Sequence, residues 1–118
     1  MAKLLGGERA AVDLDKLTGY ILNPPHPTGR HKARVFAATL GLTAAHATEL
    51  AAALKAAASQ DDAEHLRDDR YGAHYGLAFM MAFNGRTRLV RSLWVVRTGE
   101  DFPRLVSAFV AAKDKQND

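Results

Sequence analysis

Apolar residues in the first half of the chain recur every three or four positions, a spacing typical of amphipathic helices. They predict a short helix over residues 13–22 with Asp13 as its N-cap, and a second helix from residue 28 or 29 to residue 40 that Gly41 ends. An alanine-rich third helix is predicted after a Thr43 cap. The positions predicted to be buried are, in chain order, Leu14, Leu17, Ile21, Ala33, Phe36, Ala37, Leu40, Ala47, Leu50, Leu54 and Ala57. The proline-rich segment between the first two helices is predicted to be non-helical.

In the second half the apolar period changes to two, which is typical of half-buried strands. The alternation ends at Asn84-Gly85, a dipeptide that favours a two-residue type I′ hairpin. Such a turn sets Phe83 opposite Arg86 and thereby fixes every pair behind it. The further predicted pairs are Met81 with Arg88, Phe79 with Val90, Leu77 with Ser92, Tyr75 with Trp94, Ala78 with Arg91, Gly76 with Leu93, and His74 with Val95. In this register His74 and Arg91 share one surface among small residues.

A further strand is predicted over Arg104–Val110, after a turn at Thr98–Asp101. The stretch 61–69 carries five acidic residues and is predicted to be a solvated loop. Helices come first and a meander of three or more strands follows. The predicted class is therefore α+β, with N-terminal helices packed on one face of a small antiparallel sheet.

Length and composition favour one globular domain. The 118 residues are 47% hydrophobic and 25% charged, as in ordinary soluble proteins. We expect a flexible lead-in over residues 1–12, a single domain over 13–112 and a flexible tail over 113–118. The chain has no cysteine and its histidines lack the spacing of a metal site, so neither a metal nor another cofactor is predicted. No apolar run suits a signal peptide or a membrane span, which favours a cytoplasmic location without a membrane partner.

The net charge of +3 conceals an uneven distribution, because the acidic residues gather in 61–69 and leave the rest strongly basic. This balance suits a polyanion such as RNA, although solubility alone also accounts for it. The most basic stretch, His26–Arg34, places two imidazoles and three fixed cations beside a predicted helix start, without a carboxylate. Free backbone N–H groups in a first helical turn bind oxyanions, so this stretch is a candidate anion site.

Several segments resemble a known family. The strings KLTGYILNPPHPTGRHKARVF, LGLT, RYGAHYGL and VRSLWVVRTGEDFPRLVSAFV, in this order, resemble a family of uncharacterised bacterial domains found at the C-termini of polymorphic toxins and as small free-standing proteins. The resemblance covers Lys16–Val110, and the string from Trp94 to Leu105 is among its most specific parts. It implies a toxin-like α+β domain similar to the barnase, EndoU, colicin and RelE group of metal-independent ribonucleases. The partners that it implies are RNA and a cognate antitoxin or immunity protein.

Metal-independent cleavage of RNA needs a base, an acid and cations that stabilise charge on phosphorus. His26 is the first candidate for acid or base, with His31 as the alternate. Lys32 and Arg91 are the candidate phosphate clamp. The candidate substrate-binding residues are Arg30, Arg104, Ser107 and Trp94. The predicted function is a ribonuclease or RNA-binding domain, and the alternative is a non-catalytic module that binds a protein or nucleic acid, for example through a sheet edge.

Overall fold

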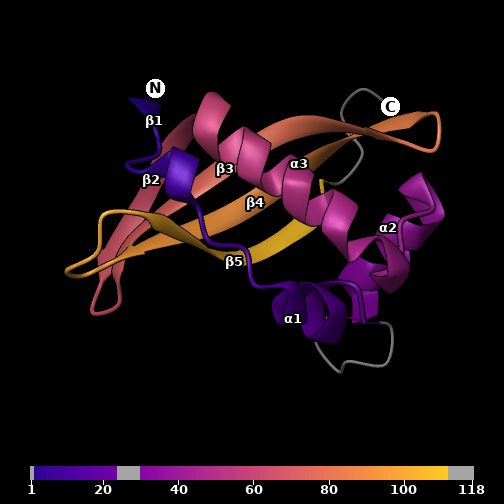
Figure 1. Ribbon diagram of the computed structural model, residues 1–118, viewed down its shortest axis with the longest axis horizontal. Coiled ribbons are helices and arrows are strands. Elements are labelled where there is room, and N and C mark those ends of the chain that lie inside the picture. The colour runs from indigo at the N-terminus through magenta and orange to yellow at the C-terminus, as the bar shows by residue number, and fades with distance from the viewer. Residues whose placement is uncertain (1, 24–29, 112–118) are drawn as a thin grey trace.

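Helical segments lie between the short first strand and the four long strands of a single antiparallel sheet, as Figure 1 shows. The computed structural model describes residues 2–23 and 30–111. Its elements are β1 (Ala2–Lys3), η1 (Gly7–Arg9), α1 (Leu14–Lys16), η2 (Leu17–Ile21), α2 (Arg30–Leu40), η3 (Ala44–His46), α3 (Ala47–Gln60), β2 (Asp62–Asp69), β3 (Gly72–Phe83), β4 (Arg86–Arg97) and β5 (Pro103–Val110). The predicted α+β class is confirmed. The predicted conformation of 24–27, the start of the second helix and the tail 113–118 lie outside the described residues.

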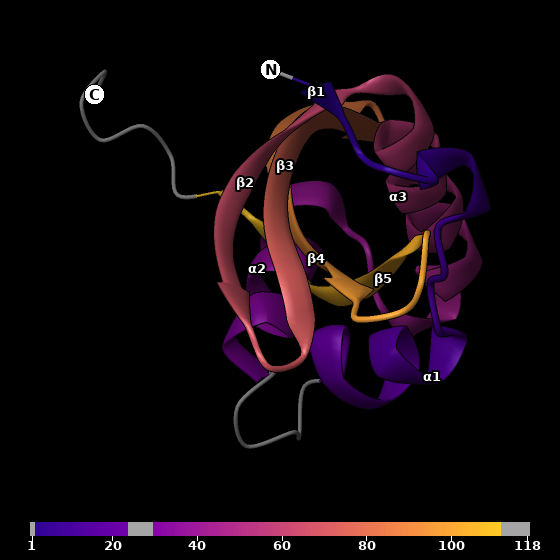
Figure 2. The same cartoon turned by 90° about the vertical axis from the view of Figure 1, so that its left-hand side faces the viewer.

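The strands follow one another in the order β1-β2-β3-β4-β5, and each pairs antiparallel with its neighbour. The sheet curves, and α3 lies against one side of it (Figure 1, Figure 2). We call this side the inner face and the opposite side the outer face. The inner face buries Leu77, Phe79, Met81, Val90, Ser92 and Trp94. Because side chains alternate along a strand, the outer face carries His74, Gly76, Ala78, Met80 and Arg91.

The predicted β3–β4 hairpin is confirmed at every pair, from Phe83–Arg86 to His74–Val95. Asn84 and Gly85 have φ values of 56° and 73°, as a type I′ turn requires. The Asn84 side chain also reaches α2, where its Nδ2 donates to the carbonyl of Leu40 at 3.0 Å. Gly41 leaves room for this amide, since a Cβ there would lie 2.7 Å from Asn84 Nδ2. The hairpin turn therefore holds the end of the second helix.

Replacing Asn84 with alanine is expected to lower the free energy of unfolding by about 1–2 kcal/mol. The change removes the hydrogen bond to the carbonyl of Leu40, and alanine adopts the left-handed conformation of this turn less readily than asparagine does. Chemical denaturation measures the difference. The variant Asn84→Gly separates the two causes, since glycine keeps the turn geometry and loses only the bond. An Asn84→Ala protein as stable as the parent would contradict this role.

The acidic stretch predicted as a loop is instead the strand β2, so that prediction is wrong. β2 pairs with β3 from Glu64–Gly76 to Asp69–Gly72, with a bulge between His65 and Arg67. Only Ala63 of this strand is buried. A strand solvated on both faces needs no apolar alternation, and the pattern that identified β3 and β4 is therefore missing from β2.

The helix signals are confirmed at Asp13, whose side chain accepts from the Asp15 N–H at 2.9 Å, and at Gly41, which ends α2 with a φ of 66°. Two predicted core positions are wrong. Leu14 is 46% exposed, because the chain widens into the π-helix η2 and turns only the later apolar residues inward. Ala37 is exposed because the buried stripe of α2, formed by Ala33, Phe36 and Leu40, is narrower than predicted.

Residues 2–12, the described part of the predicted lead-in, form hydrogen bonds with strands on both sides of the sheet, β2 and β5. β1 pairs with Asp62 and Ala63, and Leu4 is buried in the core. Ala11 exchanges backbone hydrogen bonds with β5, donating to the carbonyl of Pro103 and accepting from the N–H of Leu105. Among the described residues, no single helix is long and apolar enough to cross a membrane. Arg30–Leu40 and Ala44–Gln60 satisfy that criterion only as a pair, and the chain bends by 76° between them.

Candidate functional site

Lys32 reaches from α2 to β5. Its Nζ donates to Ser107 Oγ at 2.8 Å and to Tyr20 Oη at 3.0 Å. The ammonium also lies 5.7 Å from the ring centroid of Phe109. Two of the predicted site residues, Lys32 and Ser107, are therefore in direct contact at the edge of the sheet.

The same contact changes the acidity of Tyr20. The hydrogen bond from Lys32 lowers the pKa of Tyr20 below its usual value, against the opposing effect of partial burial, and the charge of the ammonium adds to the shift. An ultraviolet titration is expected to detect a tyrosine that ionises below the ordinary tyrosine pKa. That transition should be missing in Tyr20→Phe and should move upward in Lys32→Met. An unchanged titration of Lys32→Met would contradict the assignment.

Arg91 lies in the middle of the outer face. It pairs with Ala78 on β3 and with Phe109 on β5. Its guanidinium extends over Gly76, where an added Cβ would lie 3.4 Å from Nη2. Arg91 thus points toward β3, whereas Lys32 reaches Phe109 from α2. The two cations of the predicted clamp therefore point to different parts of the sheet and do not meet at one point.

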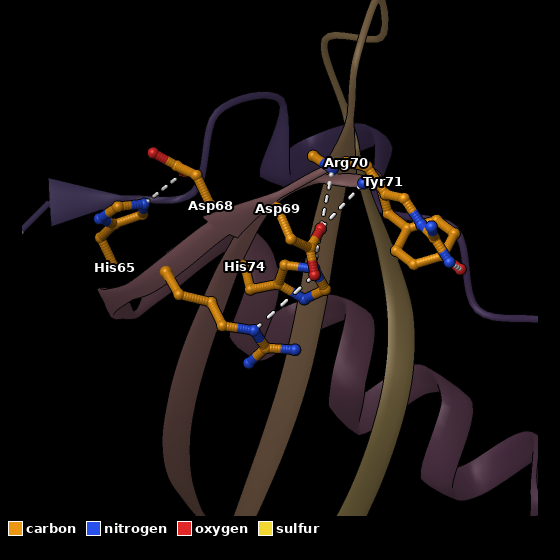
Figure 3. A network of polar contacts seen from close by, with 8 residues as sticks. His65, Asp68, Asp69, Arg70, Tyr71 and His74 are labelled. Carbon is orange, nitrogen blue, oxygen red and sulfur yellow. Dashed lines mark hydrogen bonds and ion pairs between the residues drawn. The ribbon is translucent and has the colours of Figure 1, made fainter.

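A histidine–carboxylate pair, His74 and Asp69, lies at the β2–β3 turn (Figure 3), on the same outer face as Arg91. His74 Nε2 lies 3.0 Å from Asp69 Oδ1 and 2.9 Å from Oδ2, and the His74 side chain is 13% exposed. Asp69 Oδ1 also accepts from the N–H groups of Tyr71 and Gly72, which closes the β2–β3 turn. Arg67, the cross-strand partner of His74, places its Nε 3.8 Å from Asp69 Oδ2. The Asp69 carboxylate, which is itself held by backbone N–H groups of the β2–β3 turn, therefore orients the His74 imidazole.

The charge of Asp69 is stabilised by the same contacts. Partial burial alone would raise the pKa of Asp69, but the hydrogen bonds from Tyr71, His74 and Gly72 outweigh it and hold the pKa below its usual value. Asp69 is therefore ionised at neutral pH. An ionised carboxylate orients a histidine ring and stabilises its protonated form, the role that an acid–base histidine requires of its partner.

A second histidine–carboxylate pair lies on the opposite side of the same hairpin. His65 Nε2 is 2.8 Å from Asp68 Oδ1, and the His65 ring packs 5.3 Å from that of Tyr75. His65 pairs with Tyr75 and therefore belongs to the inner-face positions, unlike His74. Its side chain is 50% exposed. The hairpin thus presents two similar pairs, of which only His74–Asp69 shares a face with Arg91.

The other predicted site residues are dispersed. Trp94 is fully buried and donates from Nε1 to Ser92 Oγ at 2.8 Å, so its prediction as a substrate contact is wrong: the ring belongs to the core. Arg104 binds both carboxylate oxygens of Glu100 at 2.9 Å. This bidentate contact lowers the pKa of Glu100 and raises the pKa of Arg104. Arg30 is exposed at the described start of α2.

His26 lies outside the described residues, and His31 lines a groove together with Lys32. Within the described ranges, no group of three or more histidine, cysteine or acidic side chains is arranged to hold a metal ion. The sequence pattern did not indicate the His74–Asp69 pair, because the acidic stretch that contains Asp69 is typical of a loop. The available signal was the register of β3: once His74 is assigned to the outer face, a short turn before Gly72 returns Asp69 to the same face.

Comparisons with known proteins agree with this fold. Residues 3–112 match the model of a family described as a domain of unknown function (DUF6883). A solved chain from the contact-dependent growth inhibition toxin–immunity protein complex of Klebsiella pneumoniae 342 is similar with a TM-score of 0.64 and 17% sequence identity. The alignment covers 88% of this chain and 95% of that one. No curated protein matches the sequence. At this identity the structural similarity establishes a shared fold.

Proposed function

The chain belongs to the DUF6883 family, and from this premise we propose that it is a toxin-like domain that cleaves RNA by metal-independent acid–base chemistry on the outer face of its sheet. The observation that carries the proposal is the His74–Asp69 pair, which shares the outer face of the sheet with Arg91. The structural neighbour comes from a toxin–immunity protein complex. This similarity supports the toxin-like part of the proposal and a cognate antitoxin or immunity protein as a partner.

In the proposed reaction, His74 takes a proton from a ribose 2′-hydroxyl. Nδ1 accepts this proton, because Nε2 donates to Asp69. The 2′-oxygen bonds to the adjacent phosphorus and the bond from phosphorus to the 5′-oxygen breaks. The products are a 2′,3′-cyclic phosphate and, once the leaving oxygen gains a proton from water or from His26, a 5′-hydroxyl. His26 thus remains a predicted second acid–base residue.

Cations around the pair supply the second requirement, stabilisation of charge on phosphorus. Arg91 extends over the glycine next to His74 on the outer face, and Arg67 stands across from His74 on β2. Lys32 adds a charge at the β5 edge, beside Phe109. An RNA strand that crosses the outer face from β2 to β5 would pass these three cations in turn, which supports RNA as the anion bound here.

The test is incubation of the purified chain with a single-stranded RNA in the presence of a metal chelator. The proposal predicts cleavage with 2′,3′-cyclic phosphate ends. A substrate with one 2′-deoxyribose at the cleaved position should stay intact there, because the attacking hydroxyl is missing. Intact RNA, or cleavage that requires a divalent metal, would contradict the proposal.

A second candidate function, binding of a protein partner without catalysis, is favoured by the edge of β2. β1 pairs with only Asp62 and Ala63, so within the described residues the rest of this edge has no strand partner. Leu66 on the same stretch is 41% exposed. A strand of a partner protein would pair with such an edge through backbone hydrogen bonds. A parent chain that leaves RNA intact in the test above would favour this function.

A further inference from the structure

A groove separates α2 from the end of β5. It has a volume of about 530 Å³, within the range of sites that hold small ligands. The helix contributes His31, Lys32, Val35 and Thr39, the strands contribute Arg88, Phe109 and Val110, and Ala111 follows the end of β5. This groove is separate from the His74–Asp69 pair, and of its lining residues the proposed function uses only Lys32, beside Phe109.

The lining combines apolar walls with positive charge. Three basic side chains, His31, Lys32 and Arg88, border the groove, and its described lining includes no carboxylate. Lys32 is fixed by Ser107, and the Phe109 ring beside it is half-buried. A flat apolar surface next to cations is the combination that binds a nucleotide, since the base packs on the ring and the phosphate meets the cations.

The groove meets the outer face at Phe109. This residue lines the groove and is the cross-strand partner of Arg91, whose guanidinium extends over Gly76 on the outer face. We infer that this groove is a nucleotide subsite, which holds the base and phosphate of one nucleotide of a single-stranded RNA at the β5 edge, away from the scissile bond. The inference rests on the proposed function for the identity of the ligand, and it extends that function by a specificity site at α2.

The experiment measures binding of a fluorescent single-stranded DNA, an RNA mimic without 2′-hydroxyl groups, so that binding is observed without cleavage. Arg88→Gln is expected to weaken binding about three- to tenfold at low salt, with a shallower salt dependence. Phe109→Leu is expected to weaken it about fivefold or more through lost stacking. Arg86→Gln is the matched control, because it removes the same charge at the hairpin turn outside the groove and should change affinity less than about twofold. Circular dichroism checks the fold of each variant.

Parent-like affinity of both Arg88→Gln and Phe109→Leu would overturn the subsite, and so would a parent that does not bind the strand. The outcome is independent of the proposed cleavage. Binding that depends on Arg88 and Phe109 in a parent that leaves RNA intact would support the groove and reject the ribonuclease. If the parent cleaves RNA but neither Arg88→Gln nor Phe109→Leu weakens binding of the DNA strand, the subsite is rejected and the proposed ribonuclease is not. An effect of Arg86→Gln as large as that of Arg88→Gln would also count against the groove.

Discussion

Replacing His74 with glutamine is expected to lower the rate of RNA cleavage by about 100-fold to 10,000-fold, the contribution typical of a general acid–base group. Glutamine keeps a polar side chain near Asp69 and cannot take up the proton of the 2′-hydroxyl. The fold should survive, because His74 lies on the outer face and makes its described polar contact with a surface turn. Initial rates on a labelled RNA, with the circular dichroism spectrum of each protein, measure both effects.

The matched control for this prediction is His65→Gln. His65 forms the same kind of pair with Asp68, in the same hairpin, but it belongs to the inner-face positions. Its replacement should change the cleavage rate less than about threefold, as expected for an exposed pair of low energetic value. Equal losses in the two variants would mean that the hairpin, and not His74, is needed. An active His74→Gln protein would reject the proposed base.

Replacing Trp94 with alanine is expected to lower the free energy of unfolding by about 3–5 kcal/mol, since the change opens a cavity beneath β4. Trp94 is fully buried, and its Nε1 donates to Ser92 Oγ, which in turn donates to the carbonyl of Leu77. The variant therefore also removes a donor from a buried polar chain. Chemical denaturation measures the loss.

Met80→Ala is the comparison for Trp94→Ala. Met80 is a large apolar side chain of the same sheet, but it is 62% exposed on the outer face, so its loss should cost about 0.5 kcal/mol or less. A Trp94→Ala protein that keeps parental stability and loses RNA binding would favour Trp94 as a substrate-binding residue. Such a result would contradict the position of the ring in the core.

The hairpin was predictable to the residue because one local signal fixes it. Asn84-Gly85 specifies a two-residue turn, and the side-chain period of two then determines each pair back to His74. The start of the first helix and the end of α2 were equally predictable. Asp13 accepts from a backbone N–H two residues away, and Gly41 adopts a positive φ itself, so both signals are local. The strand β2 was not predictable in this way, because its charged residues are solvated and the strand has no alternating apolar positions that would indicate an extended conformation.

The candidate site depends on contacts that the sequence does not encode locally. The shared face of His74 and Arg91 followed from the register, but the partner of His74 required β2. The direction of Arg91 depends on Gly76, over which both the Arg91 guanidinium and the Leu66 side chain pack. Lys32 and Ser107, 75 positions apart in the chain, meet only because α2 packs at the β5 edge. Long-range packing of this kind decides which cations act together.

The most direct test of the outer face as the RNA site is a nuclear magnetic resonance titration of the isotope-labelled parent chain with a single-stranded DNA that it cannot cleave. The account predicts that the backbone amide signals of His74, Gly76 and Arg91 shift together as the strand is added. The signals of Ala52 and Ala56, on the α3 side of the sheet, should stay in place. Shifts confined to α3, or to His65 and its neighbours on the inner-face positions, would contradict the account.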